Sequence, residues 1–332
     1  MEITEFAPIL IPTLNRYEHF KCCVESFARC TYADQTELVI GLDYPPAEKY
    51  QEGYEKIKDY VNTITGFKKV TILSTDHNLG VTENCNRMYH YIREQGYECY
   101  VFSEDDNEVA PCFLEYANWG LQYTKDDERI YAVCGFKRVD TSFLKNNVYI
   151  YPRFNAWGFA QWFKRRDKVE EFRNLTILKG LLDEMSVFSM FTSQVYKGAA
   201  IINMLKEGAV YGDGLSIFLP KEEQYCMFPT ETMSKNHGQD GSGIHGGTAR
   251  TVNLYEGLRL SEEYRFIPHI EGDLYQPELE AIYKATYKVP LRNRLRSRFE
   301  FFLYKTTGLG VFHKYGHSKF DVSLRKIKLK QQ

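Results

Sequence analysis

The chain has 332 residues, of which 43% are hydrophobic and 15% aromatic, and its formal net charge is -2. This composition is typical of a globular enzyme with a substantial core and excludes a disordered chain. A net charge near zero gives no overall attraction to nucleic acid or to an anionic membrane.

The cysteines and the N-terminus indicate a reducing, cytoplasmic location. None of the eight cysteines forms a Cys-Xaa-Xaa-Cys pair, so neither a zinc site nor a disulfide framework is indicated. The first residues lack the charged and apolar regions of a signal peptide. No apolar run is long enough to span a membrane.

Strand and helix patterns alternate over the first hundred residues. Apolar runs predict strands at residues 8–12, 37–43, 69–74 and 100–102. Apolar residues recur at helical spacing between them, and we expect Asn15 and Thr82 to cap the first and third helices. This alternation is the pattern of a right-handed βαβ sheet with both faces covered.

The fourth strand leads directly into three adjacent acids, Glu104, Asp105 and Asp106. Ligands bind at the carboxyl ends of strands in open α/β sheets, and carboxylates crowded there repel one another unless a cation lies among them. Mg²⁺ and Mn²⁺ prefer such oxygen ligands and often bridge them to phosphates. A solvated acidic turn is the alternative, but the buried strand before the acids favours a metal site.

Two other strand ends carry polar residues. Arg16, after the first strand, could contact a phosphate or a base, or could be an ordinary surface arginine. Asp43, after the second strand, could accept hydrogen bonds from a ribose or a base, although aspartate is also common in turns before proline.

These strand-end segments resemble those of GT-A-type glycosyltransferases. The resemblance rests on Pro12-Thr-Leu-Asn-Arg16, Leu42-Asp43, Asn78-Leu-Gly80 and Glu104-Asp-Asp106, in that order and spacing. The chain looks like bacterial polysaccharide glycosyltransferases related to the N-acetylglucosaminyltransferase I group. The absence of a Gly-rich phosphate loop weakens a kinase or dinucleotide-enzyme interpretation.

The resemblance implies a site for a nucleotide-sugar and a metal ion. Asp43 would meet the base, Asp105 would lie near ribose or sugar, and Asp106 would bind Mn²⁺ or Mg²⁺. The same site would include Thr13, Asn15, Arg16, Asn78, Gly80 and Glu104.

Further candidates lie in the second half of the chain. Trp157 and Gly158 belong to an aromatic segment that could stack on a sugar or could be core. By resemblance, the glycine-rich loop at 237–247 would contact the donor, and His245 would complete the metal shell or contact phosphate. Asp213 would be the catalytic base, with Asp240 as the alternative. The loop's candidate donor-binding residues are Asp240, Gly241, Ser242 and Gly243.

The C-terminal region is basic and carries interleaved apolar residues. Arginines at 292, 294, 296 and 298 alternate with leucines and phenylalanines. This pattern favours peripheral association of residues 290–330 with an anionic membrane, ahead of a helix packed on the body and well ahead of RNA binding.

The combined prediction is an α/β, GT-A (Rossmann-like), mostly parallel sheet flanked by helices, with a helical C-terminal extension. Residues 1–250 would form the catalytic domain, in halves of about 1–135 and 136–250, and 251–332 the extension. It would be a metal-dependent, inverting hexosyl- or N-acetylhexosaminyltransferase that moves a sugar from UDP to a glycan or lipid-linked acceptor of a surface polysaccharide. No nucleic-acid partner is expected. The alternatives are a sugar-phosphate nucleotidyltransferase and a non-enzymatic carbohydrate- or RNA-binding protein.

Overall fold

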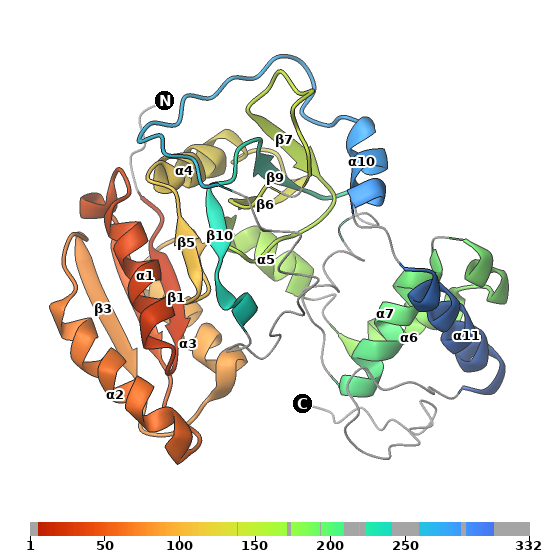
Figure 1. Cartoon of the computed structure of the whole chain (residues 1–332), viewed down its shortest axis with the longest axis horizontal. Coiled ribbons are helices and arrows are strands. Elements are labelled where there is room, and N and C mark those ends of the chain that lie inside the picture. The colour runs from red at the N-terminus through yellow and green to blue at the C-terminus, as the bar shows by residue number, and fades with distance from the viewer. Residues whose placement is uncertain are drawn as a thin grey trace. The chain divides into compact units, whose positions relative to one another are not determined.

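The computed structural model describes residues 6–137, 139–170, 174–192, 194–208, 219, 223–240, 259–286 and 290–308 (Figure 1). The chain divides into two compact units. Unit 1 contains Met1–Tyr151, Asn155–Arg166 and Gln224–Leu279, and unit 2 contains Pro152–Phe154, Asp167–Glu223 and Glu280–Gln332. The domain boundary expected at residue 250 lies outside the described residues and stays a prediction.

Unit 1 is built on an eight-stranded mixed sheet with the strand order β3-β2-β1-β4-β8-β6-β9-β7. Strands β1 to β4 are parallel to one another and β6 is parallel to β9, whereas β8 runs antiparallel to β4 and β6, and β7 runs antiparallel to β9. The strands are β1 (Ile9–Thr13), β2 (Glu37–Leu42), β3 (Lys69–Ser74), β4 (Cys99–Phe102), β6 (Ile130–Cys134), β7 (Val148–Tyr151), β8 (Phe159–Trp162) and β9 (Tyr225–Pro229).

Helices cover both faces of this sheet (Figure 1). Alternate side chains of β1 and β2, such as Ile9 and Ile40, join one core with α1, α2 and α4. On the other face α3 lies so close that a Cβ at Gly41 would be 2.7 Å from Met88 Sδ. The helices against the sheet are α1 (Tyr17–Ala28), α2 (Gln51–Tyr60), α3 (Gly80–Glu94) and α4 (Phe113–Tyr123), whereas α5 (Phe163–Glu170) and α10 (Glu278–Thr286) each run from unit 1 into unit 2.

A second, two-stranded sheet joins distant parts of the chain. Strand β5 (Asn107–Val109), directly after the acidic residues, pairs antiparallel with β10 (Ser234–Asn236). A short 3₁₀ helix, Gly238–Asp240, follows β10. This pairing places residues 236–238 beside the acidic stretch.

Unit 2 contains α6 (Leu175–Glu184), a 3₁₀ helix at Val187–Phe191, α7 (Gln194–Glu207) and α11 (Leu291–Thr307). Its core includes Leu178, Ile202 and Phe301, each fully buried. Helix α11 approaches α7 so closely that a Cβ at Gly198 would be 2.5 Å from the Phe301 ring. A buried ion pair between Lys206 and Glu300 also joins these two helices. Within the described ranges, no helix is both long and apolar enough to cross a membrane.

The predicted architecture is confirmed: a mixed, mostly parallel sheet is flanked by helices, and a helical C-terminal region is present. Two predicted helix caps are wrong. Helix α1 begins at Tyr17, after Arg16 rather than after Asn15, and no side chain caps it. Helix α3 begins at Gly80, two residues before Thr82.

Candidate active site

The candidate site lies where β1 and β4 end side by side. These strands pair in parallel, with Leu10 opposite Phe102, so the residues that follow both strands emerge at the same edge of the sheet. At this edge the Thr13 hydroxyl donates to Asp105 Oδ2 over 3.0 Å. Two segments about ninety residues apart in sequence therefore meet at Asp105.

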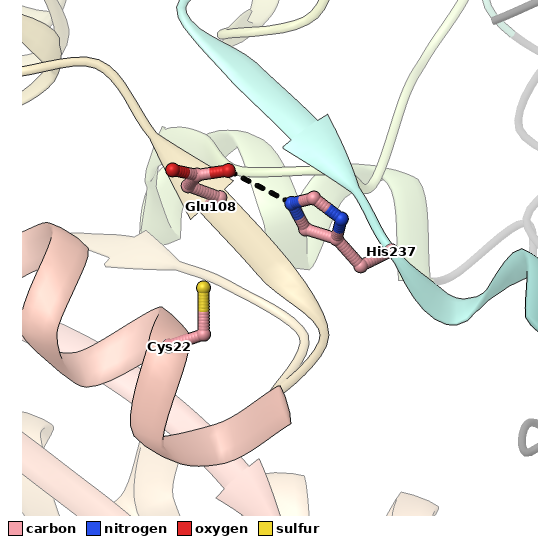
Figure 2. A group of neighbouring side chains, drawn as sticks. All are labelled: Cys22, Glu108 and His237. Atoms are coloured by element: carbon pink, nitrogen blue, oxygen red, sulfur yellow. Dashed lines mark hydrogen bonds and ion pairs between the residues drawn. The ribbon is translucent and has the colours of Figure 1, made fainter. Parts of the chain in front are cut away.

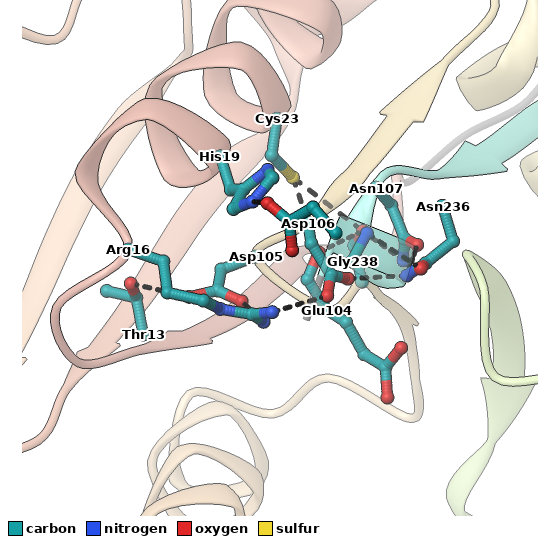
Figure 3. A network of polar contacts seen from close by, with 12 residues as sticks. Thr13, Arg16, His19, Cys23, Glu104, Asp105, Asp106, Asn107, Asn236 and Gly238 are labelled. Carbon is teal, nitrogen blue, oxygen red and sulfur yellow. Dashed lines mark hydrogen bonds and ion pairs between the residues drawn. The ribbon is translucent and has the colours of Figure 1, made fainter. Parts of the chain in front are cut away.

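Arg16 binds both aspartates of the acidic cluster (Figure 3). Its guanidinium pairs with Asp105 Oδ1, and its Nη1 lies 2.7 Å from Asp106 Oδ2. The Arg16 side chain is 20% exposed, and the two carboxylates are 8% and 9% exposed. Of the two interpretations of Arg16, the surface arginine is therefore wrong, because the residue is part of the cluster.

The chain after β10 closes the other side of Asp106. The Asn236 amide donates to Asp106 Oδ1 over 2.5 Å, and the His237 backbone N–H donates to the Asp106 carbonyl over 2.8 Å. Gly238 is required by space, because a Cβ there would lie 2.1 Å from Asp106 Oδ2. Asp106 is thus held by Arg16, in the turn after β1, and by Asn236 and His237, at and just after the end of β10.

The charges of the cluster are not balanced among these side chains. Burial, together with Asp106 and Asp105, raises the pKa of Glu104 to about 8. Burial also raises the pKa of Asp105, although Arg16 opposes this shift. Asp105 and Asp106 raise the pKa of Arg16 more than burial lowers it. Fully ionised, the three acids and the one arginine would leave two negative charges uncompensated.

This donor set fits a hard divalent cation. Carboxylate oxygens are the ligands that Mg²⁺ and Mn²⁺ prefer, and a dication would supply the missing positive charge. Each oxygen of Asp106 accepts one hydrogen bond from the protein and keeps a second lone pair. The Glu104 side chain points away from Arg16 (Figure 3).

Asp43, Asn78 and Gly80 form a second cluster, at the start of α3. Asp43 Oδ1 accepts from the backbone N–H groups of Tyr44 and Leu79, and Oδ2 accepts from the Asn78 amide and the Gly80 N–H, all at 2.8–3.0 Å. Asp43 therefore caps α3 from a neighbouring strand end. Because each oxygen already accepts two hydrogen bonds, little capacity is left for a nucleotide base, and base binding stays a prediction.

The aromatic segment lies next to β10. The Ser234 hydroxyl donates to the Trp157 carbonyl, and the Trp157 ring packs edge-on against Phe136 with centroids 4.7 Å apart. Gly158 has φ +74°, a conformation that glycine adopts without strain. Trp162, in contrast, donates its ring N–H to the Leu121 carbonyl and packs against the core.

The remaining predicted residues are only partly described. Asp240 Oδ2 lies 2.9 Å from His19 Nε2, which joins the end of the short 3₁₀ helix to α1. Asn15 lies in the turn before α1, where its carbonyl oxygen is so near Gly53 that a Cβ there would approach within 2.0 Å. The other calls, Asp213, Gly241, Ser242, Gly243 and His245, lie outside the described residues.

Asn236 and Gly238 contact Asp106. The sequence placed Gly238 in the glycine-rich loop expected to contact the donor, but it gave Asn236 no role. Ser234–Asn236 is a three-residue strand without a detectable period, and its partner lies about 130 residues earlier. The only sequence signal near them was the glycine-rich loop that begins at 237.

Comparison with known proteins gives limited information. No protein-family model and no curated protein matches the chain. Similar solved structures include the apo bifunctional glycosyltransferase WbbM (13% identity, 53% of this chain and 35% of that chain, TM-score 0.33). They also include S. aureus TarS (14% identity, 66% of this chain and 43% of that chain, TM-score 0.35). A third is apo mouse xyloside xylosyltransferase 1 (10% identity, 54% of this chain and 75% of that chain, TM-score 0.33).

The chain therefore spans 35% and 43% of the lengths of the first two structures. At these identities and TM-scores, the likenesses establish neither a shared activity nor a relation to N-acetylglucosaminyltransferase I.

Proposed function

We propose that this protein is a metal-dependent glycosyltransferase that uses a nucleotide-sugar. The observation that carries the proposal is the acidic cluster at the ends of β1 and β4, where two carboxylates pair with the single Arg16 and a third acid, Glu104, adjoins them. This site has more negative than positive charge and lies at the edge of the sheet where ligands bind, so it suits a dication together with a diphosphate. The resemblance of the strand-end segments to GT-A enzymes narrows the reaction to sugar transfer.

The residues of the cluster have distinct roles in this proposal. Asp106, with Glu104, would hold Mg²⁺ or Mn²⁺, which stabilises negative charge on the departing diphosphate. Arg16 lies 2.7 Å from Asp106 Oδ2, so it is within reach of the same phosphates. Asn236 and Gly238 keep Asp106 in position. Asp105, fixed by Thr13 and Arg16, would face the ribose or sugar.

The finer features of the activity rest on the sequence resemblance. The donor would be a UDP-sugar, and the product would be a hexosyl or N-acetylhexosaminyl linkage, formed with inversion, in a surface polysaccharide. Inversion requires a base on the sugar face opposite the diphosphate, and Asp213 is the candidate. General-base loss typically lowers the rate by about 10²–10⁴-fold. Asp213→Asn is expected to lower kcat in that range while donor binding persists.

The decisive experiment measures UDP binding with Mn²⁺ and with EDTA. In the wild type, binding should require the metal. Asp106→Asn should lose most of this metal-dependent binding, whereas Asp59→Asn, at an exposed site on α2, should bind normally. Equal affinity of the wild type for UDP with Mn²⁺ and with EDTA would refute the metal-dependent site.

We also propose that α11 binds an anionic membrane surface from the cytoplasmic side. Four apolar side chains on the helix are exposed: Leu291 (67%), Leu295 (55%), Phe299 (52%) and Phe302 (42%). They recur every three or four residues, so they share one face of the helix. Exposed arginines at 292, 294 and 296 lie on the same helix and provide charge complementary to anionic lipid.

The packed-helix alternative applies to the C-terminal half of α11, where Phe301 and Tyr304 enter the core of unit 2. Removing the whole helix would therefore expose that core, and a point variant is the better test. Leu295→Glu should reduce sedimentation with phosphatidylserine vesicles, whereas Ile267→Glu, at an exposed site in unit 1, should not. Equal sedimentation of all three proteins would refute membrane binding through α11.

A further inference from the structure

Three potential metal ligands outside the acidic cluster converge from separate elements. Cys22 lies on α1, Glu108 on β5, and His237 directly after β10 (Figure 2). One ligand atom from each residue lies within 4.8 Å of the other two. His237 Nε2 is 2.8 Å from Glu108 Oε2, and Figure 2 shows the Cys22 side chain near this pair.

We propose that Cys22, Glu108 and His237 bind a Zn²⁺-type ion. Thiolate, imidazole and carboxylate are all ligands that zinc takes, whereas Mg²⁺ and Mn²⁺ prefer oxygen alone. The side chains of Glu108 and His237 are 29% and 36% exposed, so water can complete a four-coordinate site. This site is separate from the proposed donor site and does not depend on that function.

The geometry needs only small changes to accept the ion. Metal–ligand distances of about 2.0–2.3 Å in a tetrahedral site separate the ligand atoms by about 3.3–3.8 Å. The hydrogen bond of 2.8 Å between His237 and Glu108 must therefore open slightly, with loss of its proton. Arg29 Nη2 lies 3.9 Å from the other oxygen of Glu108, Oε1, which orients Oε2 toward His237.

The ion would link α1 to the β5–β10 pair. Asn236 and the backbone of His237 hold Asp106, and Glu108 lies two residues after Asp106. Binding at Cys22 would fasten this segment to α1 without touching the acidic cluster. The ion would thereby keep the segment after β10 in place.

Cobalt substitution tests the site directly, because a thiolate bound to Co²⁺ gives a charge-transfer band that oxygen ligands do not give. The full-length protein, stripped with EDTA and dialysed, is titrated with Co²⁺, and the band should saturate at one ion per chain. Cys22→Ser should abolish the band. Loss of a group that only supports a metal ligand typically weakens metal binding by about 10–100-fold. His237→Gln removes a ligand itself, so it should weaken Co²⁺ binding by at least this factor.

Two controls make the result specific. Cys85→Ser, at another partly buried cysteine, on α3, should keep the band. Asp106→Asn should also keep it, so failure of the proposed donor site would leave this result unchanged. The proposal is overturned if the wild type shows no thiolate band, or if the band survives Cys22→Ser. Circular dichroism of each variant verifies that it is folded.

Discussion

Replacing Arg16 with methionine tests whether one guanidinium balances the acidic cluster. The substitution keeps the apolar part of the side chain and removes the charge beside two carboxylates that are 8% and 9% exposed. Removing one partner of a buried ion pair typically costs about 3–5 kcal/mol. Because the Arg16 side chain is 20% exposed, we expect a loss near the lower end, about 3 kcal/mol, at pH 8.

The pH dependence gives the sign of the effect. Without Arg16, Asp105 and Glu104 lose a compensating charge, so their folded-state pKa values, which are already raised, rise further above the unfolded ones. Groups with a raised pKa contribute stability at low pH that is lost as the pH rises through the folded value. The penalty of Arg16→Met should therefore be small at pH 5, where the acids take up protons, and largest at pH 8. Mn²⁺ should restore part of it.

Urea unfolding at pH 5, 7 and 8, with and without Mn²⁺, measures these differences. Arg129→Met is the matched control, because Arg129 is exposed and pairs with Asp127 at the surface. Exposed pairs contribute about 0–1 kcal/mol, so this variant should remain close to the wild type at each pH. A penalty for Arg16→Met that is the same at pH 5 and pH 8, or absent at pH 8, would refute the reasoning.

Three further predictions concern single side chains. Gly238→Ala should cost about 1–3 kcal/mol in urea unfolding because its Cβ meets Asp106. Gly180→Ala, in open space inside α6, should instead stabilise the protein by up to about 1 kcal/mol, because alanine favours a helix more than glycine does. Glu104→Gln should be as stable as the wild type near pH 4.5 and more stable above pH 8, because ionising a group with a raised pKa destabilises the folded wild type. Equal stabilities of the two proteins at pH 9 would contradict the raised pKa of Glu104. Lys206→Met should cost about 3–5 kcal/mol by stranding its buried carboxylate partner, and an unchanged unfolding midpoint would contradict this.

The sequence predicted the elements whose pattern is local. The run at 69–74 became β3 with the same bounds. The prediction failed where a residue distant in the sequence determines the start of a helix. Thr82 looked like a cap, but Asp43 satisfies the first N–H groups of α3 from the end of β2.

The candidate site likewise contains residues that a local sequence pattern identifies and residues that depend on distant pairing. Glu104–Asp106 could be found because three acids follow a buried strand, and their closeness to Arg16 follows from the adjacency of β1 and β4. Asn236 could not be found, because its contact with Asp106 depends on pairing two strands of three residues each. Such short segments have no period that distinguishes them from a loop.

The insertion of residues 167–223 between β8 and β9 has a consequence for synthesis on the ribosome. A nascent chain that ends near residue 166 already contains β6, but β9, which covers the second edge of β6, comes only after the insertion. An unpaired edge of this kind can pair with a neighbouring chain. Translational pausing within 167–223 should therefore increase aggregation, and a chaperone that shields the β6 edge during this interval should increase the yield of folded protein.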